Sequence, residues 1–400
     1  PPRTMKGRAK LNVDSIVSKI PTLTPVDDEH DAWAIDLINQ LASCTYQCDK
    51  DLLPLAILKG LRWTLNRGTC ATTAPILANV GVLFVGVGDF QSAKKFADVA
   101  LTMTTSENRA RTVFVCYCLI AHRQLPLASC KKPIFSSYEQ CMKVGDLETA
   151  FLCFGFILVL SVAGGTKLSL IIEDYEKYTN VMRLHNQDKP MLITAMLWQL
   201  VFNLSSTSPS SNSNVLDGEI LDLQATIWKV KDAPEHALEW QHLSRTRAIC
   251  AFWFDDFDLV CDIMDESQFD RFIPEKETPG YVCAGSLYTY CALACLSIVQ
   301  SRSIRRKLRY KRRRQAQTFY NKIKEWVRKG NVSVQNSEPL IEAEFNSIDG
   351  KRLQAQKNFE KSILLSGRSG ISNIQALAHE RYAIHHQTKA KNINEAKYHY

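Results

Sequence analysis

Residues 74–107 read APILANVGVLFVGVGDFQSAKKFADVALTMTTSE and predict two helices joined by a tight turn. Apolar residues recur at helical spacing on both sides of Gly88-Asp89. Glycine supplies the left-handed conformation that ends a helix, and aspartate caps the helix that follows. The small residues Gly81, Ala93 and Ala100 allow the two helices to approach closely. The stretch therefore indicates a helix–turn–helix unit.

The same stretch resembles a tetratricopeptide-like repeat of 34 residues. In such a unit the eighth, twentieth and twenty-seventh positions are small, and here they are Gly81, Ala93 and Ala100. Phe90 is one of the large apolar residues around them. Four further copies combine a polar or glycine turn with apolar and small residues, and they contain Gly145, Asp146, Leu147, Ala150 and Phe154; Asp255, Asp256, Phe257 and Val260; Ala343, Gly350, Ala355 and Phe359; and Asn392, Ile393, Ala396 and Tyr400.

The distance between Gly88 and Gly145 is not a multiple of 34 residues, so the array is irregular. Because a single helix pair cannot bury its own apolar face, neighbouring pairs stack and leave a concave surface for partners. The fold we predict is therefore all-α: a right-handed α-solenoid of irregular tetratricopeptide-like helix pairs.

Composition agrees with long helices joined by short loops. Apolar residues make up 46% of the 400 residues and charged residues 22%, which excludes disorder over most of the length. Glycine (17) and proline (14) are scarce, which disfavours a β protein with many turns. The helical apolar pattern begins near Asp31 and includes Trp33, Ile35, Leu37, Ile38, Leu41, Leu52, Leu55, Ile57, Leu58 and Leu61.

Breaks in the pattern divide the chain into six parts. The serine-rich stretch around residues 205–215 cannot bury apolar surface, and a basic stretch interrupts the last third. We expect a partly disordered lead-in at 1–30, a tetratricopeptide-like block at 31–204, a flexible loop at 205–215, a helical block at 216–300, a basic segment at 301–314 and a further tetratricopeptide-like block at 315–400. The chain begins without methionine and ends in mid-pattern, which we interpret as a piece of a longer protein.

The net charge of +8 has a local origin. Nine Lys or Arg residues lie between Arg302 and Arg314, and without them the net charge would be −1. We favour a solvated helix end followed by a charged loop before Trp326. A nuclear-import signal, a polyanion contact and an anionic membrane surface remain open. The cations of a polyanion contact would be Arg305, Arg306, Lys307, Arg309, Lys311, Arg312, Arg313 and Arg314.

The run from Thr278 to Ser301 is uncharged and long enough to cross a bilayer. Its polar residues and the break at Pro279-Gly280 favour a buried helix instead, so we expect no membrane partner. Because the positive charge is confined to one segment, we also expect no nucleic-acid partner. Thirteen cysteines scattered through apolar stretches favour a reducing, intracellular compartment, the cytoplasm, with a nuclear location left open by the basic segment.

Motifs of enzyme chemistry are missing from the sequence. Gly164-Gly165-Thr166-Lys167 lacks the spacing of a phosphate-binding loop, and we interpret it as a helix terminator. The pairs Cys44/Cys48 and Cys291/Cys295 are interpreted as core residues. His379, His385 and His386 are interpreted as surface residues of the last repeat. We therefore predict no catalytic, cofactor-binding or metal-binding residues.

The ordered landmarks resemble the tetratricopeptide-like region of large signalling ATPases. In that family a protein kinase-like domain and an AAA/STAND-type ATPase precede the helical region, and a GAF domain with a histidine kinase or cyclase commonly follows it. The landmarks are Gly88-Asp89-Phe90, Gly145 to Ala150, Gly164-Gly165, Asn203-Leu204, Leu216 to Glu219, Phe254 to Phe257, Leu340 to Glu344 with Gly350, and Ala376 to Glu380.

The resemblance implies a protein–protein interaction and regulatory arm within an ATP-dependent signal-transduction protein, with the catalytic centre elsewhere. Its concave face would bind a protein partner or other domains of the same polypeptide. Two alternatives remain. One is a free-standing helical adaptor, or a polyanion-binding protein that uses residues 302–314. The other is part of an ATPase or kinase whose active site lies outside this chain.

Overall fold

The computed structural model describes residues 12–48, 51–205, 213–233, 236–268, 282, 284–301 and 304–400. Over these residues the chain is all-helical and forms no strand, apart from one isolated bridge between Pro25 and Thr69. The serine-rich loop at 205–215 lies largely outside the described residues.

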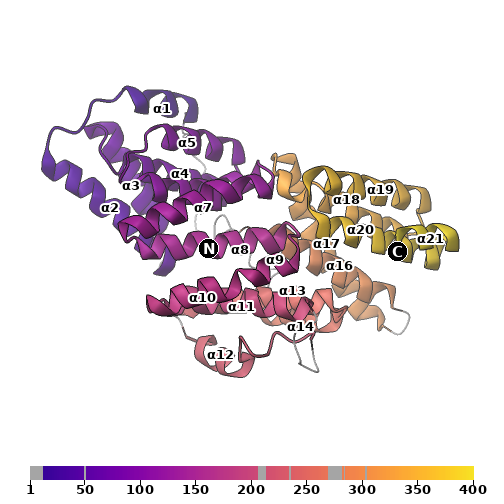
Figure 1. The fold of residues 1–400 in the computed structure, drawn as a ribbon. Coiled ribbons are helices and arrows are strands. Elements are labelled where there is room, and N and C mark those ends of the chain that lie inside the picture. Colours follow the sequence, from indigo (N-terminus) through magenta and orange to yellow (C-terminus); the bar gives the residue numbers. More distant parts are fainter. Residues whose placement is uncertain are drawn as a thin grey trace.

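The helices follow one another with short connections (Figure 1). Their bounds are α1 Val13–Lys19, α2 Glu29–Cys48, α3 Leu53–Arg67, α4 Thr73–Gly86, α5 Phe90–Thr102, α6 Arg109–Val115, α7 Leu127–Val144, α8 Leu147–Ala163, α9 Leu168–Glu173, α10 Tyr175–Leu184, α11 Asp188–Leu204, α12 Leu223–Val230, α13 Ala237–Trp253, α14 Phe257–Glu266, α16 Ala284–Gln300, α17 Arg306–Arg328, α18 Ser337–Ile348, α19 Arg352–Ser369, α20 Ser372–His385 and α21 Ile393–His399.

Neighbouring helices pack as pairs along the chain. α4 packs against α5, α7 against α8, α13 against α14, α16 against α17, and α18 against α19. Shorter 3-10 and π-helical pieces interrupt this order, among them η2 (Cys116–Ile120) and η3 (Ala121–Arg123) after α6. The arrangement is an all-helical, repeat-like fold.

The structure describes the lead-in from Asn12 onward. There α1 is followed by a 3-10 turn at Ile20–Thr22, and the Ile20 side chain is fully buried in the core. α1 packs on α5, and Lys95 forms an ion pair with Asp14. The Asn12 side chain caps α1 by accepting a hydrogen bond from the Ser15 N–H, which explains why a short polar segment forms a helix.

A large apolar core runs through the described helices, from Ile20 to Tyr382. α16 is buried along almost its whole length, as expected for a helix inside the array. The break at Pro279-Gly280 lies outside the described residues. None of the helices that the structure describes is both long and apolar enough to cross a bilayer.

The last third of the chain packs back onto the first. Trp326, near the end of α17, is fully buried, and its ring lies 5.2 Å from the Arg123 guanidinium carbon. The same guanidinium carbon lies 5.9 Å from the Phe90 ring. Arg123 therefore joins two parts of the chain that are far apart in sequence.

A second contact of this kind joins the start of α20 to the end of α8. The Ser372 hydroxyl donates a hydrogen bond to the Gly165 carbonyl at 2.8 Å. The Asn373 amide donates to the carbonyls of Val162 and Ala163, each at 3.3 Å.

Candidate functional site

The predicted repeat turns share one backbone geometry. Gly88, Gly145 and Gly350 have φ of 73°, 79° and 74°, and Asp255 takes the same left-handed conformation at 57°. In the fifth copy, Lys391 takes this conformation at 54°, directly before Asn392. A left-handed residue at this position ends the first helix of each pair.

Backbone hydrogen bonds close these turns in the same way. The Asp89 N–H donates to the Phe84 carbonyl at 2.9 Å, and the Asp146 N–H donates to the Cys141 carbonyl at 3.0 Å. This bond, from the second residue past the helix back to its last turn, belongs to the Schellman motif. Asp89, Asp146, Asp256 and Asn392 then cap the following helix with a side-chain oxygen.

The small residues lie where the paired helices are closest. A methyl group on Gly81 would meet the end of the Ile120 side chain at 2.6 Å and the Ala93 carbonyl at 3.0 Å, so a larger residue would require both neighbours to shift. Ala93 and Ala100 are fully buried. The other packing residues are buried as well, except for the half-buried Phe257, and they are Phe90, Ala150, Phe154, Ala343, Ala355, Phe359 and Ala396.

The structure contains turns of the same kind that the repeat copies did not include. Asn186, Gly330 and Gly370 all have positive φ and follow a helix, as Gly165 does. Glycine or asparagine after an apolar helical run was the signal available for them. Gly165 ends α8, in agreement with the interpretation of residues 164–167 as a helix terminator.

The basic segment differs from the expectation of a charged loop before Trp326. α17 runs without interruption through the boundary at 314/315. It contains neither glycine nor proline, so nothing in its sequence ends the helix before Trp326. Arg305 precedes the helix, the cations in the helix are Arg306, Lys307, Arg309, Lys311, Arg312, Arg313 and Arg314, and Arg302 lies outside the described residues.

Three of these cations form ion pairs inside the protein. Lys311 and the buried Arg312 bind Asp265 at 2.7 and 2.9 Å. Arg313 binds both oxygens of Asp349, at 2.8 and 2.9 Å. The segment is therefore partly structural, because it fastens α17 to α14 and to the end of α18.

The electrostatics at Asp265 favour its ionised form. Burial alone raises the pKa of this carboxyl, but hydrogen bonds from Lys311 and Gln315 and the charge of Arg312 outweigh burial and lower it. The sequence analysis identified the cations, but it did not identify their partner Asp265, which lies 47 residues before Arg312. No local pattern links residues so far apart.

The apolar pattern of α2 and α3 does not all face the core. Ile35, Ile57 and Leu61 are buried, whereas Trp33 and Leu37 are each 68% exposed. Leu41, 51% exposed, continues the same helix face, because residues four apart lie one above the other. We call Trp33, Leu37 and Leu41 the α2 stripe. The neighbouring helix α3 also has exposed apolar residues, which are Leu55 and Leu58, and Leu52 directly before it is exposed as well.

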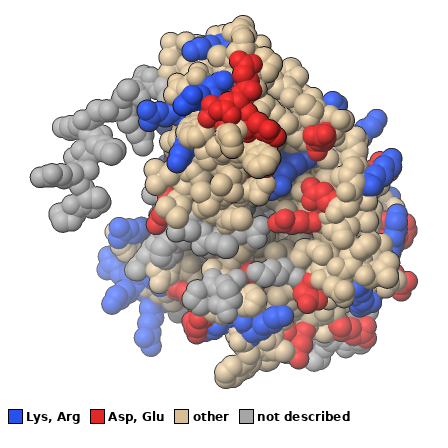
Figure 2. Space-filling model, turned by 90° about the vertical axis from the view of Figure 1, so that its left-hand side faces the viewer, with Lys and Arg blue, Asp and Glu red and all other residues tan. Residues whose placement is uncertain are grey.

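The end of the molecule that carries α1 to α3 combines charged and uncharged surface. Figure 2 shows one cluster of acidic side chains near the top of this face, with further acidic and basic side chains scattered over the rest of it. Uncharged surface fills much of the area between them. Exposed apolar patches on a protein surface are typical of interaction sites in general.

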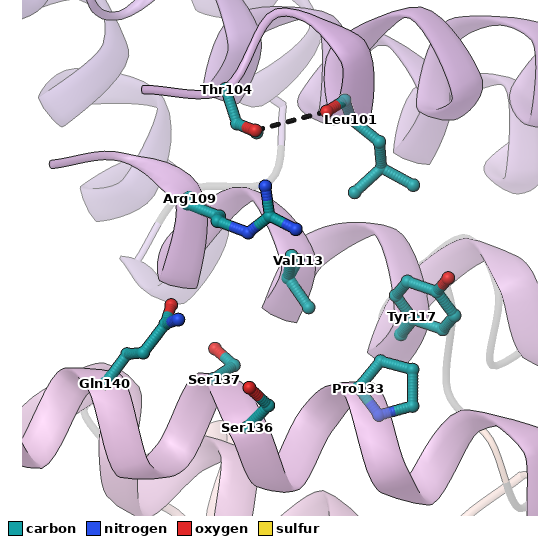
Figure 3. A pocket seen from close by; sticks show the side chains of 9 residues that line it. All are labelled: Leu101, Thr104, Arg109, Val113, Tyr117, Pro133, Ser136, Ser137 and Gln140. Carbon is teal, nitrogen blue, oxygen red and sulfur yellow. Dashed lines mark hydrogen bonds between the residues drawn. The ribbon is translucent and has the colours of Figure 1, made fainter. Parts of the chain in front are cut away.

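A cavity of about 330 Å³ opens between the end of α5, α6 and α7 (Figure 3). Arg109 is the only charged residue that lines it, so no acid–base pair converges there. Thr104 bonds back to the Leu101 carbonyl and is not directed at a ligand. The remaining lining residues are Val113, Tyr117, Pro133, Ser136, Ser137 and Gln140.

The described cysteines are free, and most of them are buried. Cys291 and Cys295 lie in the core, as expected, whereas Cys44 is exposed and the side chain of Cys48 lies outside the described residues. Burial raises the pKa of Cys250 to about 12, which keeps that thiol protonated and unreactive.

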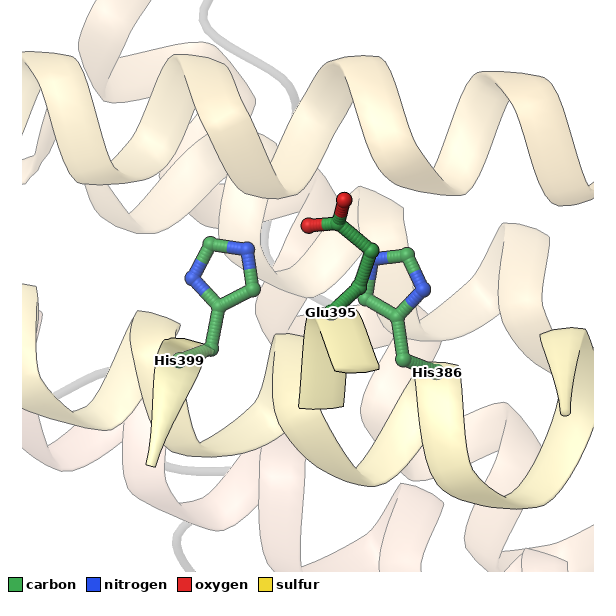
Figure 4. A group of neighbouring side chains, drawn as sticks. All are labelled: His386, Glu395 and His399. Carbon is green, nitrogen blue, oxygen red and sulfur yellow. The ribbon is translucent and has the colours of Figure 1, made fainter. Parts of the chain in front are cut away.

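Histidines near the C-terminus differ from the expectation of surface residues. His385 and His386 are buried, because the helix that carries them packs against α18, α19 and α21. His386 groups with Glu395 and His399, and one ligand atom from each lies within 4.8 Å of the others (Figure 4). The sequence interpretation considered His379, His385 and His386 and did not include Glu395 or His399, which lie four residues apart on α21.

Comparison with protein families, curated proteins and solved structures gives no match to this chain. The resemblance to the helical region of signalling ATPases therefore stays a prediction from its residues.

Proposed function

We propose that the chain is a protein-binding module of helix pairs and that the α2 stripe is its partner-binding surface. The observation that carries this proposal is the exposure of Trp33, Leu37 and Leu41 on one face of α2. Leaving three large apolar side chains in water is unfavourable, and a large exposed tryptophan is a typical anchor of protein interfaces.

The partner that fits best is an amphipathic helix. The stripe extends over about 12 Å, since Trp33 and Leu41 are eight residues apart on a helix that rises about 1.5 Å per residue. A partner helix that presents apolar residues at four-residue spacing would cover this length with about two turns. Leu55, exposed on α3, would add to the contact.

For the whole chain, we propose an irregular right-handed solenoid of tetratricopeptide-like pairs. Its support is the shared geometry of the turns at Gly88, Gly145, Asp255, Gly350 and Lys391. The ordered landmarks further support a role as the regulatory arm of an ATP-dependent signalling protein. The free, mostly buried cysteines support an intracellular, cytoplasmic location.

Crosslinking at the stripe tests the binding surface. A photoreactive amino acid replaces Gln40, an exposed residue of α2 that lies next to Leu41 in sequence, and the crosslinked protein is identified and purified. Its affinity is then measured for the wild type and for Trp33→Ser/Leu37→Ser. We expect roughly a 30-fold loss or more, because a buried tryptophan anchor contributes at least about 2 kcal/mol.

The matched control is Trp228→Ser, which removes a tryptophan that is 84% exposed on α12. We expect it to leave the affinity unchanged. Equal affinities for the stripe variant and the wild type would overturn the proposed surface. If the stripe variant lost its partner but left ATP hydrolysis by the longer protein unchanged, the regulatory role would be overturned and the binding role kept.

A further inference from the structure

We propose that His386, Glu395 and His399 bind a divalent transition-metal ion of the zinc class. The three side chains come from η6 (His386–Ala390) and α21, at the C-terminal edge of the described fold. Figure 4 shows the Glu395 carboxylate between the two imidazole rings. This inference does not depend on the α2 stripe or on the proposed partner.

His386 is the residue that points most directly to a ligand. It is 3% exposed, and neither ring nitrogen has a hydrogen-bond partner in the part of the chain that the structure describes. A buried polar group without a partner costs about 1–3 kcal/mol. A metal ion bound to one ring nitrogen would remove this cost.

The backbone brings the other two ligands back to His386. Lys391 adopts a left-handed conformation, and the Asn392 N–H donates to the His386 carbonyl at 3.0 Å. The Asn392 side chain then caps α21 through the Glu395 N–H. Glu395 and His399 are four residues apart on this helix, so both side chains lie on one face.

His379 orients one of the ligands. Its Nδ1 lies 2.9 Å from His399 Nδ1, so one ring donates a hydrogen bond to the other. This bond leaves Nε2 of His399 available for an ion, which is the arrangement common for metal-bound histidines.

The donor set selects the metal. Two imidazole nitrogens and one carboxylate suit zinc and its neighbours, whereas magnesium and calcium prefer oxygen donors alone. A tetrahedral ion with bonds of about 2.0–2.1 Å needs ligand atoms roughly 3.4 Å apart, which small side-chain rotations would achieve. The fourth position would remain open to water.

Binding would also fasten α21 to the rest of the protein. Ala396 is the buried residue of this short helix, which packs on α20. An ion shared between His386 and the two α21 side chains would restrain it directly. Metal binding should therefore slow backbone hydrogen exchange in residues 393–400.

The test uses the full chain, freed of metal with a chelator and titrated with Co²⁺ and then Zn²⁺. We expect one Co²⁺ per chain, with visible absorbance of a four-coordinate ion and no near-ultraviolet thiolate band. That band would report binding by cysteine instead. Hydrogen exchange measured with and without Zn²⁺ should show protection confined to the C-terminal edge.

Glu395→Gln and His399→Asn should each weaken Co²⁺ binding by roughly 10- to 100-fold. Glu395 is exposed and His399 half-buried, so both variants should fold, which circular dichroism verifies. Lys397→Gln on the same helix and the exposed His30→Asn on α2 are the controls. Absence of stoichiometric binding, or binding that both site variants leave unchanged, would overturn the proposal.

Discussion

His122 is a buried ionisable residue at the centre of the molecule, next to Arg123 in η3. Burial, followed by the charge of Arg123, lowers the pKa of His122 well below its ordinary value of 6.5. The ring is therefore neutral in the folded protein. In the unfolded chain it takes up a proton as the pH falls through 6.5.

This difference predicts a pH dependence of stability. Above pH 6.5 neither state binds the proton, and the contribution of His122 is fully present. Below pH 6.5 only the unfolded state binds it, so the free energy of unfolding falls by up to about 1.4 kcal/mol per pH unit. Urea unfolding of the wild type and of His122→Leu between pH 8 and 5 measures this slope. The variant should lack the contribution of His122, so that about one proton fewer is taken up on unfolding.

The exposed His30 provides the control, because His30→Gln should leave the slope as it is in the wild type. Parallel slopes for the wild type and His122→Leu would show that His122 binds its proton in the folded state as well.

Residue-level features were only partly predictable from the sequence. The helical spacing of Trp33 and Ile35 was correct, but periodicity alone does not show which apolar face lacks a neighbour. The cations of α17 were evident, whereas their partners Asp265 and Asp349 are distant in sequence. The grouping of His386 with Glu395 and His399 was not foreseen, because the left-handed turn at Lys391 brings α21 back to His386.

At the level of elements, the turns are the best-predicted feature. Glycine or a short polar residue after an apolar run, followed by aspartate, describes both the end of one helix and the cap of the next. The length of α17 was not predictable in this way, because a dense run of cations resembles a loop until its acidic partners are known. The π-helical piece η2 has no sequence signal that we recognise.

Gly145 provides a test of these turns. Its φ is 79°, and a methyl group built on it would meet nothing within 4 Å, so any cost of substitution comes from the backbone alone. Gly145→Ala should lower the free energy of unfolding by about 1 kcal/mol, since alanine disfavours this conformation. Gly145→Asn should cost less, because asparagine tolerates it. Chemical denaturation of the two variants measures the difference, and equal stability of Gly145→Ala and the wild type would contradict this account.

At the level of the whole molecule, the contacts between the first and last thirds could not be predicted. The repeat pattern specifies how each pair meets its neighbour, but not that Trp326 meets Arg123 or that Ser372 meets Gly165. These contacts depend on the accumulated curvature of every pair between them. The sequence interpretation therefore could not anticipate these contacts between distant parts of the chain.

Because of this packing, we expect that a substitution that destabilises α17 also destabilises α4 and α5, which are distant from it in sequence. Trp326→Ala should cost about 3–5 kcal/mol, because it leaves a large cavity in a fully buried site. Hydrogen exchange should then accelerate in α4 and α5 as well as in α17 and α18. Trp228→Ala, at an exposed site, should change stability by less than about 0.5 kcal/mol. Acceleration limited to α17 and its sequence neighbours would show that the two ends are not coupled.

The hydrogen bonds between α20 and the end of α8 also bear on how the molecule would respond to mechanical load. An open stack of helix pairs extends gradually when it is pulled, as a soft spring does. Here Ser372 and Asn373 tie the far end back to Gly165, Val162 and Ala163. A force applied to the two ends would first act on these hydrogen bonds. We therefore expect little extension until they break, followed by an abrupt extension.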